Sequence, residues 1–161
     1  ILLPQLPEFG CPKPTLIPVG IDQHPYILLA RDVAKKLGMI PPSELVVKFQ
    51  PSLLDPEQKM SGSKPNTAIY LNDTEDVIKK KISRAYTGAV SSLEDHRRYG
   101  AIPEICSVFA LLLNHHPDDI FVEKIRNEYA SGRMTTSELK NITADFVVGL
   151  VSDQQRRIYD S

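Results

Sequence analysis

The sequence predicts an α/β unit followed by an all-α region, and two patterns in its 161 residues lead to this prediction. Within residues 15–49, a short apolar run, a helix-spaced segment and a second apolar run follow one another, which is the order of a βαβ unit with a parallel sheet. From residue 74 onward, apolar residues recur at helical spacing, with start and stop signals between the segments. We therefore predict two domains, residues 1–73 and residues 74–161.

The βαβ pattern consists of three segments. Residues 15–20 are apolar, rich in β-branched side chains and ended by a glycine, and residues 44–49 form a second strand candidate. Between them, residues 25–37 carry apolar side chains at helical spacing, with two lysines in the last turn and a glycine beyond it. Residues 1–14 contain four prolines, which donate no backbone hydrogen, so we expect an irregular segment there.

The second region reads as a series of helices. A brief extended run at residues 68–71 leads to a strong helix start at Asn72, Asp73 and Thr74. The expected helices cover residues 77–86, 92–99, 103–115 and 118–130, followed by a long final helix. Thr135 and Glu138 have the spacing of a capping box at the start of that last helix.

Composition limits the class of protein. The formal net charge is −1, so no global basic field attracts the chain to nucleic acid, and any such contact must depend on local patches. Cys11 and Cys106 form neither a CxxC pair nor a dense secreted pattern, which favours reduced thiols in a cytoplasmic protein. No apolar run approaches the ~20 residues of a membrane span. The chain begins at Ile1 without an initiator methionine, so we expect it to be part of a longer protein.

A cationic loop lies between the two regions. It reads Lys59, Met, Ser61, Gly and Ser63, and Lys64 follows directly; we call residues 59–64 the lysine loop. Lysine is a mobile point charge, and serine offers hydroxyl and backbone donors, so such a loop can wrap a polyphosphate. The alternative is a solvated turn with no ligand. The two serines have no evident partner base in the sequence, so we expect them to bind rather than act as nucleophiles.

A second candidate element follows the first predicted strand. In parallel sheets, ligands bind beyond the carboxyl ends of the strands, and Gly20, Asp22 and Gln23 occupy that edge. A carboxylate and an amide at a helix start can bond ribose hydroxyls and an amino group. Alternatively, Asp22 is only a helix N-cap and Gln23 only a surface amide. We call residues 20–23 the Asp-Gln turn.

Other clusters are less specific. Residues 79–81 are three lysines and Arg84 follows, a set that either faces a phosphate backbone or forms a solvated helix face. The four histidines show no catalytic arrangement; His96 lies in a charged helical segment, and residues 115–116 end a helix, where a cation suits the dipole. No His, Cys, Asp or Glu cluster has metal-ligand spacing, so no metal site is predicted.

Several runs together carry a resemblance. They are residues 18–23 (Pro-Val-Gly-Ile-Asp-Gln), 30–34 (Ala-Arg-Asp-Val-Ala), the lysine loop, 94–97 (Glu-Asp-His-Arg), 131–134 (Ser-Gly-Arg-Met) and 138–140 (Glu-Leu-Lys). This set resembles the tryptophanyl-tRNA synthetases, class I aminoacyl-tRNA synthetases, in their archaeal and eukaryotic form, over nearly the whole chain. Tyrosyl-tRNA synthetases share the Asp-Gln turn and the lysine loop. Residues 22–26 and 131–140 favour the tryptophan family.

The resemblance implies a fold and a reaction. Residues 1–73 would be the C-terminal half of a Rossmann-type catalytic domain, and residues 74–161 a helical anticodon-binding domain. ATP, with Mg²⁺, and tryptophan would give tryptophanyl-adenylate, whose aminoacyl group passes to the acceptor end of tRNA(Trp). Lys59 would hold the β- and γ-phosphates, with Ser61 and Ser63 orienting the loop. In the other element, Gly20 would let the backbone approach the nucleotide, Asp22 would contact the ribose and Gln23 the amino acid.

The sequence departs from the family pattern at two points. Gly62 stands where many class I enzymes have a second lysine, and Lys64 could compensate, since in an extended chain it would project to the same side. The chain also lacks the His-x-Gly-His element that class I enzymes use to bind ATP. We therefore expect this chain to be a C-terminal portion of the enzyme that is inactive by itself. The resemblance also implies that the enzyme is a homodimer. The alternatives are a tyrosyl-tRNA synthetase or a non-catalytic RNA-binding module derived from a synthetase.

Overall fold

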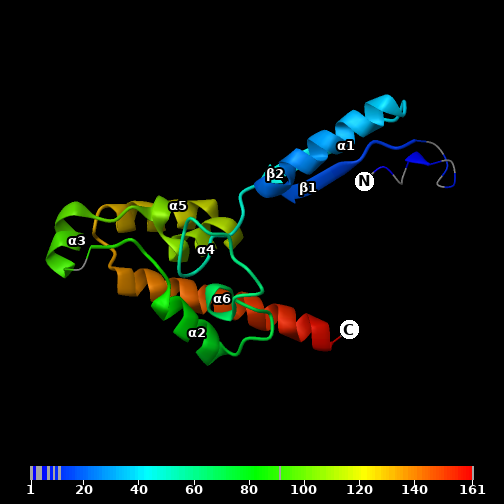
Figure 1. Ribbon diagram of the computed structural model, residues 1–161. Coiled ribbons are helices and arrows are strands. Elements are labelled where there is room, and N and C mark those ends of the chain that lie inside the picture. Colours follow the sequence, from blue (N-terminus) through cyan, green and yellow to red (C-terminus); the bar gives the residue numbers. More distant parts are fainter. Residues whose placement is uncertain are drawn as a thin grey trace. The chain divides into compact units, whose positions relative to one another are not determined.

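The computed structural model describes residues 2, 5–6, 8, 10, 12–90 and 92–160. The chain divides into two compact units, which we call the strand unit (Ile1–Phe49) and the helical unit (Gln50–Ser161) (Figure 1). The division falls earlier than the predicted boundary after residue 73, because Leu53, Met60 and Ile69 pack into the helical core. The assignment of separate catalytic and anticodon-binding domains stays a prediction.

The strand unit contains the predicted βαβ arrangement. Strands β1 (Leu16–Gly20) and β2 (Ser43–Val47) pair in parallel, with Leu16 opposite Ser43 and Gly20 opposite Val47. Helix α1 (His24–Lys36) connects them and runs beside them (Figure 1). The two strands therefore end side by side, and the Asp-Gln turn leaves the sheet at this common carboxyl end.

The strand unit leaves much apolar surface open. On α1, Ile27 and Ala34 are buried and lie two turns apart on one face. Large apolar side chains on the strands, along α1 and directly after it are exposed, namely Leu16, Tyr26, Leu28, Leu29, Val33, Leu37, Leu45, Val46 and Val47. Parallel sheets are normally covered on both faces. Within these residues, the sheet thus has less cover than parallel sheets usually have.

The helical unit contains five α-helices among the described residues: α2 (Glu75–Arg84), α3 (Leu93–Tyr99), α4 (Ser107–His115), α5 (Asp119–Ala130) and α6 (Thr136–Tyr159). The long α6 packs against α2, α4 and α5 (Figure 1). All five lie where the sequence predicts helices. The predicted helix at 103–115 begins differently, because Pro103–Ile105 forms a 3-10 turn, η5, and α4 starts only after Cys106. Residues 68–71 form no strand.

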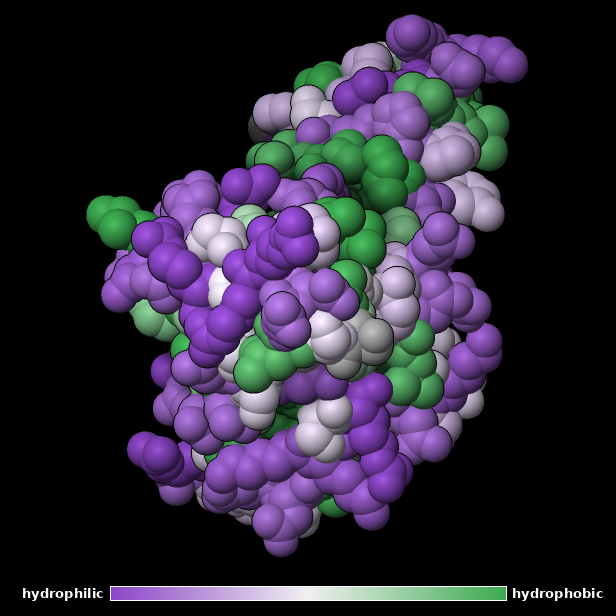
Figure 2. All heavy atoms as spheres, turned by 90° about the vertical axis from the view of Figure 1, so that its left-hand side faces the viewer, coloured by the Kyte–Doolittle hydropathy of each residue, from purple (hydrophilic) through white to green (hydrophobic). Residues whose placement is uncertain are grey.

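The core of the helical unit is well closed. Ile82, Leu112, Leu139 and Tyr129 are fully buried and belong to one hydrophobic cluster. On the face of this unit that Figure 2 shows, hydrophilic residues predominate and hydrophobic residues form separate patches. Full burial of a large apolar side chain, as in this core, contributes roughly 1.5–3 kcal/mol to the stability of the folded state. The helical unit therefore has a larger closed core than the described part of the strand unit.

The capping box predicted at the start of α6 is confirmed. The Thr135 backbone N–H donates to Glu138 Oε2 at 2.7 Å, and the Glu138 N–H donates to Thr135 Oγ1 at 3.2 Å. The Thr135 hydroxyl also donates to Glu138 Oε2 at 2.7 Å, and the hydrogen bonds that the Thr135 backbone N–H and hydroxyl donate to this carboxylate lower the pKa of Glu138. Among the described residues, three other helices have side-chain caps as well: α3 from Ser92, α4 from Cys106 and α5 from Asp118. The predicted start at Thr74 is confirmed, but its side chain makes no capping hydrogen bond.

The end of α3 approaches the end of α5 closely. Gly132 has a φ of +73°, and a Cβ there would lie 2.3 Å from the carbonyl oxygen of His96. In the same region, the His96 ring is buried and its Nε2 donates to the carbonyl oxygen of Met134 at 2.8 Å. His96 is therefore part of the core, although its neighbours in sequence are charged.

Two expectations from composition concern cysteine and membranes. Cys106 is a free, buried thiol whose pKa is raised by burial. Cys11 lies outside the described residues, as does part of the proline-rich segment at 1–14. None of the described helices combines the length and the apolar character needed to cross a membrane.

Candidate functional site

The lysine loop rises from a hydrogen-bonded hairpin. Pro51 and Lys59 pair in an antiparallel bridge, and the Met60 N–H donates to the Gln50 carbonyl at 2.8 Å. At the tip of the hairpin, Asp55 accepts hydrogen bonds from the Glu57 N–H at 3.0 Å and from Gln58 Nε2 at 2.8 Å. The base of the loop is thus fixed by its own backbone.

The hairpin is anchored to the helical core. Leu53 is fully buried, its N–H donates to the Thr67 carbonyl at 3.0 Å, and its own carbonyl accepts from the Tyr86 N–H at 2.7 Å. Met60 is half-buried against the same core, whereas Lys59 beside it is exposed. Burial of Met60 therefore directs the neighbouring Lys59 toward solvent.

The structure brings together all four predicted residues of the lysine loop. Ser61 and Ser63 share a hydrogen bond between their hydroxyls at 2.9 Å, and Ser63 and Lys64 are exposed. The Lys64 N–H donates to the Ser61 carbonyl at 3.2 Å, which makes the segment a turn. The expectation of an extended chain through Gly62 is therefore wrong. The Lys64 ammonium instead lies 3.4 Å from Gln58 Oε1, to which it donates.

Gly62 has no conformational reason to be glycine. Its φ lies outside the left-handed region, and a Cβ there would meet no atom within 4 Å. Its carbonyl accepts a hydrogen bond from the Tyr70 hydroxyl at 2.7 Å. A larger side chain at this position would thus fit the loop as it stands.

An ion pair holds Tyr70 in place. Lys81 donates to Asp73 Oδ2 at 2.6 Å, and both side chains are 12% exposed. The same oxygen accepts the Tyr70 N–H at 2.9 Å, and the Lys81 ammonium lies 4.6 Å from the centre of the Tyr70 ring. Tyr70 therefore links α2 to the lysine loop. Sequence reasoning missed this link, because its members lie in three separate segments.

The Asp-Gln turn lies in the strand unit. Gly20 ends β1, and residues Ile21–Gln23 form a 3-10 turn, η3, that leads directly into α1. A Cβ on Gly20 would lie 2.7 Å from Asp22 Oδ1, so the glycine makes room for this carboxylate. Gln23 Nε2 donates to Asp22 Oδ2 at 3.3 Å. Asp22 is not an N-cap, since Gly20 and Gln23 occupy the two capping positions.

Glu44 holds the start of α1, directly after the Asp-Gln turn, and was not predicted as a site residue. Its side chain is 7% exposed. Glu44 Oε1 accepts a hydrogen bond at 2.9 Å from Nδ1 of His24, the residue directly after the turn. Arg31 lies 3.8 Å from the same oxygen. A charged residue inside an otherwise apolar strand is the signal that could have identified Glu44.

The predicted site residues thus form two groups in two different units. Gly20, Asp22 and Gln23 belong to the strand unit, and the lysine loop belongs to the helical unit. Their roles toward ATP and the amino acid stay predictions. Among the residues that the structure describes, no group of three His, Cys, Asp or Glu side chains is arranged to hold a metal ion.

Comparison with known proteins identifies the family. A family described as "tRNA synthetases class I (W and Y)" matches residues 6–152. The chain belongs to this family. It is 43% identical to the tryptophan–tRNA ligase of Methanocaldococcus jannaschii over 163 aligned residues, which cover 98% of the chain and 44% of that relative. It is 40% identical to the cytoplasmic tryptophan–tRNA ligase of Rattus norvegicus, over 88% of the chain and 30% of the relative.

Solved structures of this family separate its two branches. The tryptophanyl-tRNA synthetase of Aeropyrum pernix K1 matches 99% of the chain with a TM-score of 0.89 and 35% identity, over 44% of its own length. The tyrosyl-tRNA synthetase of Aeropyrum pernix matches 84% of the chain with a TM-score of 0.60 and 32% identity, over 41% of its own length. The fold is thus more similar to the tryptophanyl structure. The chain spans less than half the length of these class I synthetases.

Proposed function

We propose that this chain is the C-terminal portion of a tryptophan–tRNA ligase, which activates tryptophan with ATP and transfers it to tRNA(Trp). The observation that carries the proposal is 43% identity to a tryptophan–tRNA ligase across 98% of the chain. The TM-scores of 0.89 and 0.60 favour tryptophan over the tyrosine alternative. Residues 1–73 would supply the second half of a Rossmann-type catalytic domain, whose further strands would cover the exposed sheet of the strand unit.

In the proposed activation step, a tryptophan carboxylate oxygen attacks the α-phosphorus of ATP. The new P–O bond gives the adenylate, and the bond to the β-phosphate breaks, so that pyrophosphate leaves with the electron pair. The step needs no protein nucleophile. Lys59 would stabilise the charge that develops on pyrophosphate, since a positioned cation acts most strongly where charge develops. Mg²⁺ would arrive with ATP as part of the substrate.

The other residues of the lysine loop would position the phosphates. Ser61 and Ser63, joined by the hydrogen bond at 2.9 Å, offer hydroxyls beside the Lys59 backbone. Lys64 would add a second cation in place of the lysine that many class I enzymes carry at position 62. Among the described residues, the Lys64 ammonium donates only to the uncharged amide of Gln58, at 3.4 Å, so turning it toward a phosphate breaks no ion pair there.

The Asp-Gln turn would bind the rest of the substrates. Asp22 would accept hydrogen bonds from the ribose, and Gln23 would contact the polar end of tryptophan. Gly20 would allow close approach of the backbone to the nucleotide. The room that Gly20 leaves for the Asp22 carboxylate supports these roles, because the two functions need the same small residue.

The remaining assignments concern RNA and assembly. Residues 74–161 would bind the anticodon of tRNA(Trp), whose single-stranded bases are open to stacking and edge contacts. The acceptor end would reach the adenylate in the complete catalytic domain. By family likeness, the complete enzyme would be a cytoplasmic homodimer. In isolation, the chain would be inactive, which leaves a non-catalytic RNA-binding module as the second candidate function.

Amino-acid-dependent exchange between ATP and pyrophosphate tests the proposal. We expect the complete protein to catalyse exchange with tryptophan and not with tyrosine, and the 161-residue chain to catalyse none. Exchange with tyrosine would identify the tyrosyl branch. No exchange by the complete protein with either amino acid would leave the RNA-binding module as the better description.

A further inference from the structure

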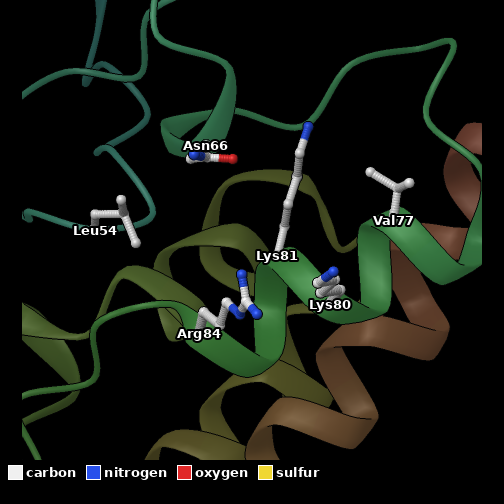
Figure 3. Close-up of a pocket in the computed structure, with 6 residues that line it drawn as sticks. All are labelled: Leu54, Asn66, Val77, Lys80, Lys81 and Arg84. Atoms are coloured by element: carbon white, nitrogen blue, oxygen red, sulfur yellow. The ribbon is translucent and has the colours of Figure 1, made fainter.

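A basic pocket lies on α2, next to the end of the lysine loop. Its lining residues are Leu54, Asn66, Val77, Lys80, Lys81 and Arg84, and its volume is about 360 Å³ (Figure 3). The activation step proposed above uses none of these residues. Asn66 belongs to η4 (Pro65–Thr67), directly after the lysine loop, and Leu54 belongs to the hairpin before it, so three segments of the helical unit meet at this pocket.

Two of the three cations in the basic pocket are uncompensated. Lys81 is committed to Asp73 at 2.6 Å. Lys80 and Arg84 are exposed, and neither makes an ion pair or side-chain hydrogen bond within the described part of the chain. They lie four positions apart on α2, so they share one helix face. Together they offer two positive charges to one ligand.

The lining of the basic pocket suits a nucleotide unit better than a free anion. Arg84 can bind a phosphate with two hydrogen bonds or stack on a base, and Lys80 can add a point charge. Leu54 and Val77 are 46% and 38% exposed and form an apolar rim. Inorganic phosphate or pyrophosphate gains nothing from such a rim, whereas a ribose or a base can lie against it. The Asn66 amide can meet a hydroxyl or a base edge.

A second hollow continues along the same helix. It has a volume of about 610 Å³ and is lined from α2 and α6 by Lys79, Lys80, Ser83, Lys140, Asn141, Ala144 and Asp145. Lys79 is paired there with Glu75 at 2.7 Å, and this ion pair raises the pKa of its ammonium. Lys140 donates to the Ser83 carbonyl, and burial lowers the pKa of its ammonium. The second hollow adds donors but little free charge.

We propose that the basic pocket binds the phosphodiester backbone of RNA, with a phosphate on Lys80 and Arg84 and the attached nucleoside against Leu54 and Val77. Two hollows that share Lys80 favour an extended strand over a single small anion. In naming tRNA as the source of that strand, the inference rests on the proposed function. It adds to the proposed function a surface for the RNA backbone beside the lysine loop.

Titration of a fluorescently labelled tRNA(Trp) transcript with the 161-residue chain tests this inference. We expect the double variant Lys80→Glu/Arg84→Glu to bind at least tenfold more weakly than the unchanged chain. The slope of log affinity against log salt should also fall by about one for each phosphate that the variant no longer binds. Lys124→Glu is the matched control, because Lys124 is exposed on α5 and lines neither hollow; it should change affinity less than about twofold.

Three results would overturn the inference. They are unchanged tRNA binding by the double variant, an equal loss in Lys124→Glu, and absence of tRNA binding by the unchanged chain at about 50 mM salt. Displacement of tRNA from the pocket by millimolar pyrophosphate, with the same dependence on Lys80 and Arg84, would indicate a site for small anions instead. Arg84→Lys, which keeps the charge, should retain most of the binding, and an unchanged helical circular dichroism spectrum of the double variant would show that its weaker binding is not due to unfolding.

Failure of this inference is distinguishable from failure of the proposed function. In the complete enzyme, the double variant should keep tryptophan-dependent exchange and lose tRNA charging at low tRNA concentration, because exchange requires no RNA. Absent exchange in the unchanged complete enzyme would contradict the proposed function but leave the tRNA titration unaffected.

Discussion

The lysine loop and the Asp-Gln turn are both predicted to bind ATP, but the chain holds them in different ways. The loop depends on the helical unit: Leu53, near its base, is buried in the helical core, and Tyr70, held through Asp73 by Lys81 of α2, donates to the Gly62 carbonyl. The turn depends on its neighbours, since Gly20 makes room for Asp22 and Gln23 donates to it. Local sequence is therefore enough to shape the turn, whereas the loop requires the helical unit.

The two units that carry these elements also differ in how much apolar surface they bury. The helical unit buries Tyr129, Leu112 and Ile82 in one cluster, and the loop is built on it. The strand unit leaves Leu16, Leu45 and other apolar side chains exposed on its sheet. Substitutions near the lysine loop should thus lower the stability of the helical unit, whereas matched substitutions in the turn should not.

The largest expected effect is that of Asp73→Asn. Removal of this carboxylate leaves Lys81, only 12% exposed, without its partner, and we expect the free energy of unfolding to fall by about 2–3 kcal/mol. The matched change in the turn, Asp22→Asn, removes an exposed charge and should change it by less than about 0.5 kcal/mol. Urea unfolding followed by circular dichroism measures both. Equal losses would show that the two elements are held alike.

A smaller effect is expected for Tyr70→Phe. It removes the hydrogen bond to Gly62 at 2.7 Å and keeps the ring beneath Lys81, so stability should fall by about 1 kcal/mol or less. Limited proteolysis should cut the lysine loop faster in this variant than in Tyr26→Phe, the control in the strand unit. If both are cut at the same rate, the Tyr70 hydroxyl does not hold the loop.

The smallest effects on stability should come from the two site glycines, yet they should differ in function. Gly20→Ala places a methyl group 2.7 Å from Asp22 Oδ1, which forces the flexible carboxylate to turn away at a cost below about 1 kcal/mol. Gly62→Ala meets no atom and should be neutral. In the complete enzyme, only Gly20→Ala should raise the KM for ATP. A raised KM in Gly62→Ala alone would reverse the comparison.

Sequence reasoning succeeded where the determinants were local. The parallel βαβ unit, the five helices and the capping box of Thr135 and Glu138 follow from spacing and capping residues within short windows. The hydrogen bond that holds the lysine loop at Gly62 was missed, and so was the packing of the loop's base into the helical unit, because both depend on partners outside the loop, namely Tyr70 and Tyr86.

The candidate site was predicted to a similar extent. The four loop residues and the three turn residues each lie together in the structure, as their adjacency in sequence implies. Glu44 and the pair of Asp73 with Lys81 were not predicted, since each pairs across separate segments. Of the basic residues at 79–84, Lys79 and Lys81 form ion pairs, whereas Lys80 and Arg84 form none with the described residues, a distinction that a charge run does not reveal.

Lys59→Ala in the complete enzyme tests the central claim most directly, namely that the lysine loop on the helical unit supplies the cation for pyrophosphate departure. We predict that the rate of tryptophan-dependent ATP–pyrophosphate exchange falls ~10²-fold or more while the KM for tryptophan changes little. Lys64→Ala, measured beside it, shows how far the second cation contributes. An unchanged exchange rate in Lys59→Ala, or a loss seen only as weaker tryptophan binding, would contradict the claim.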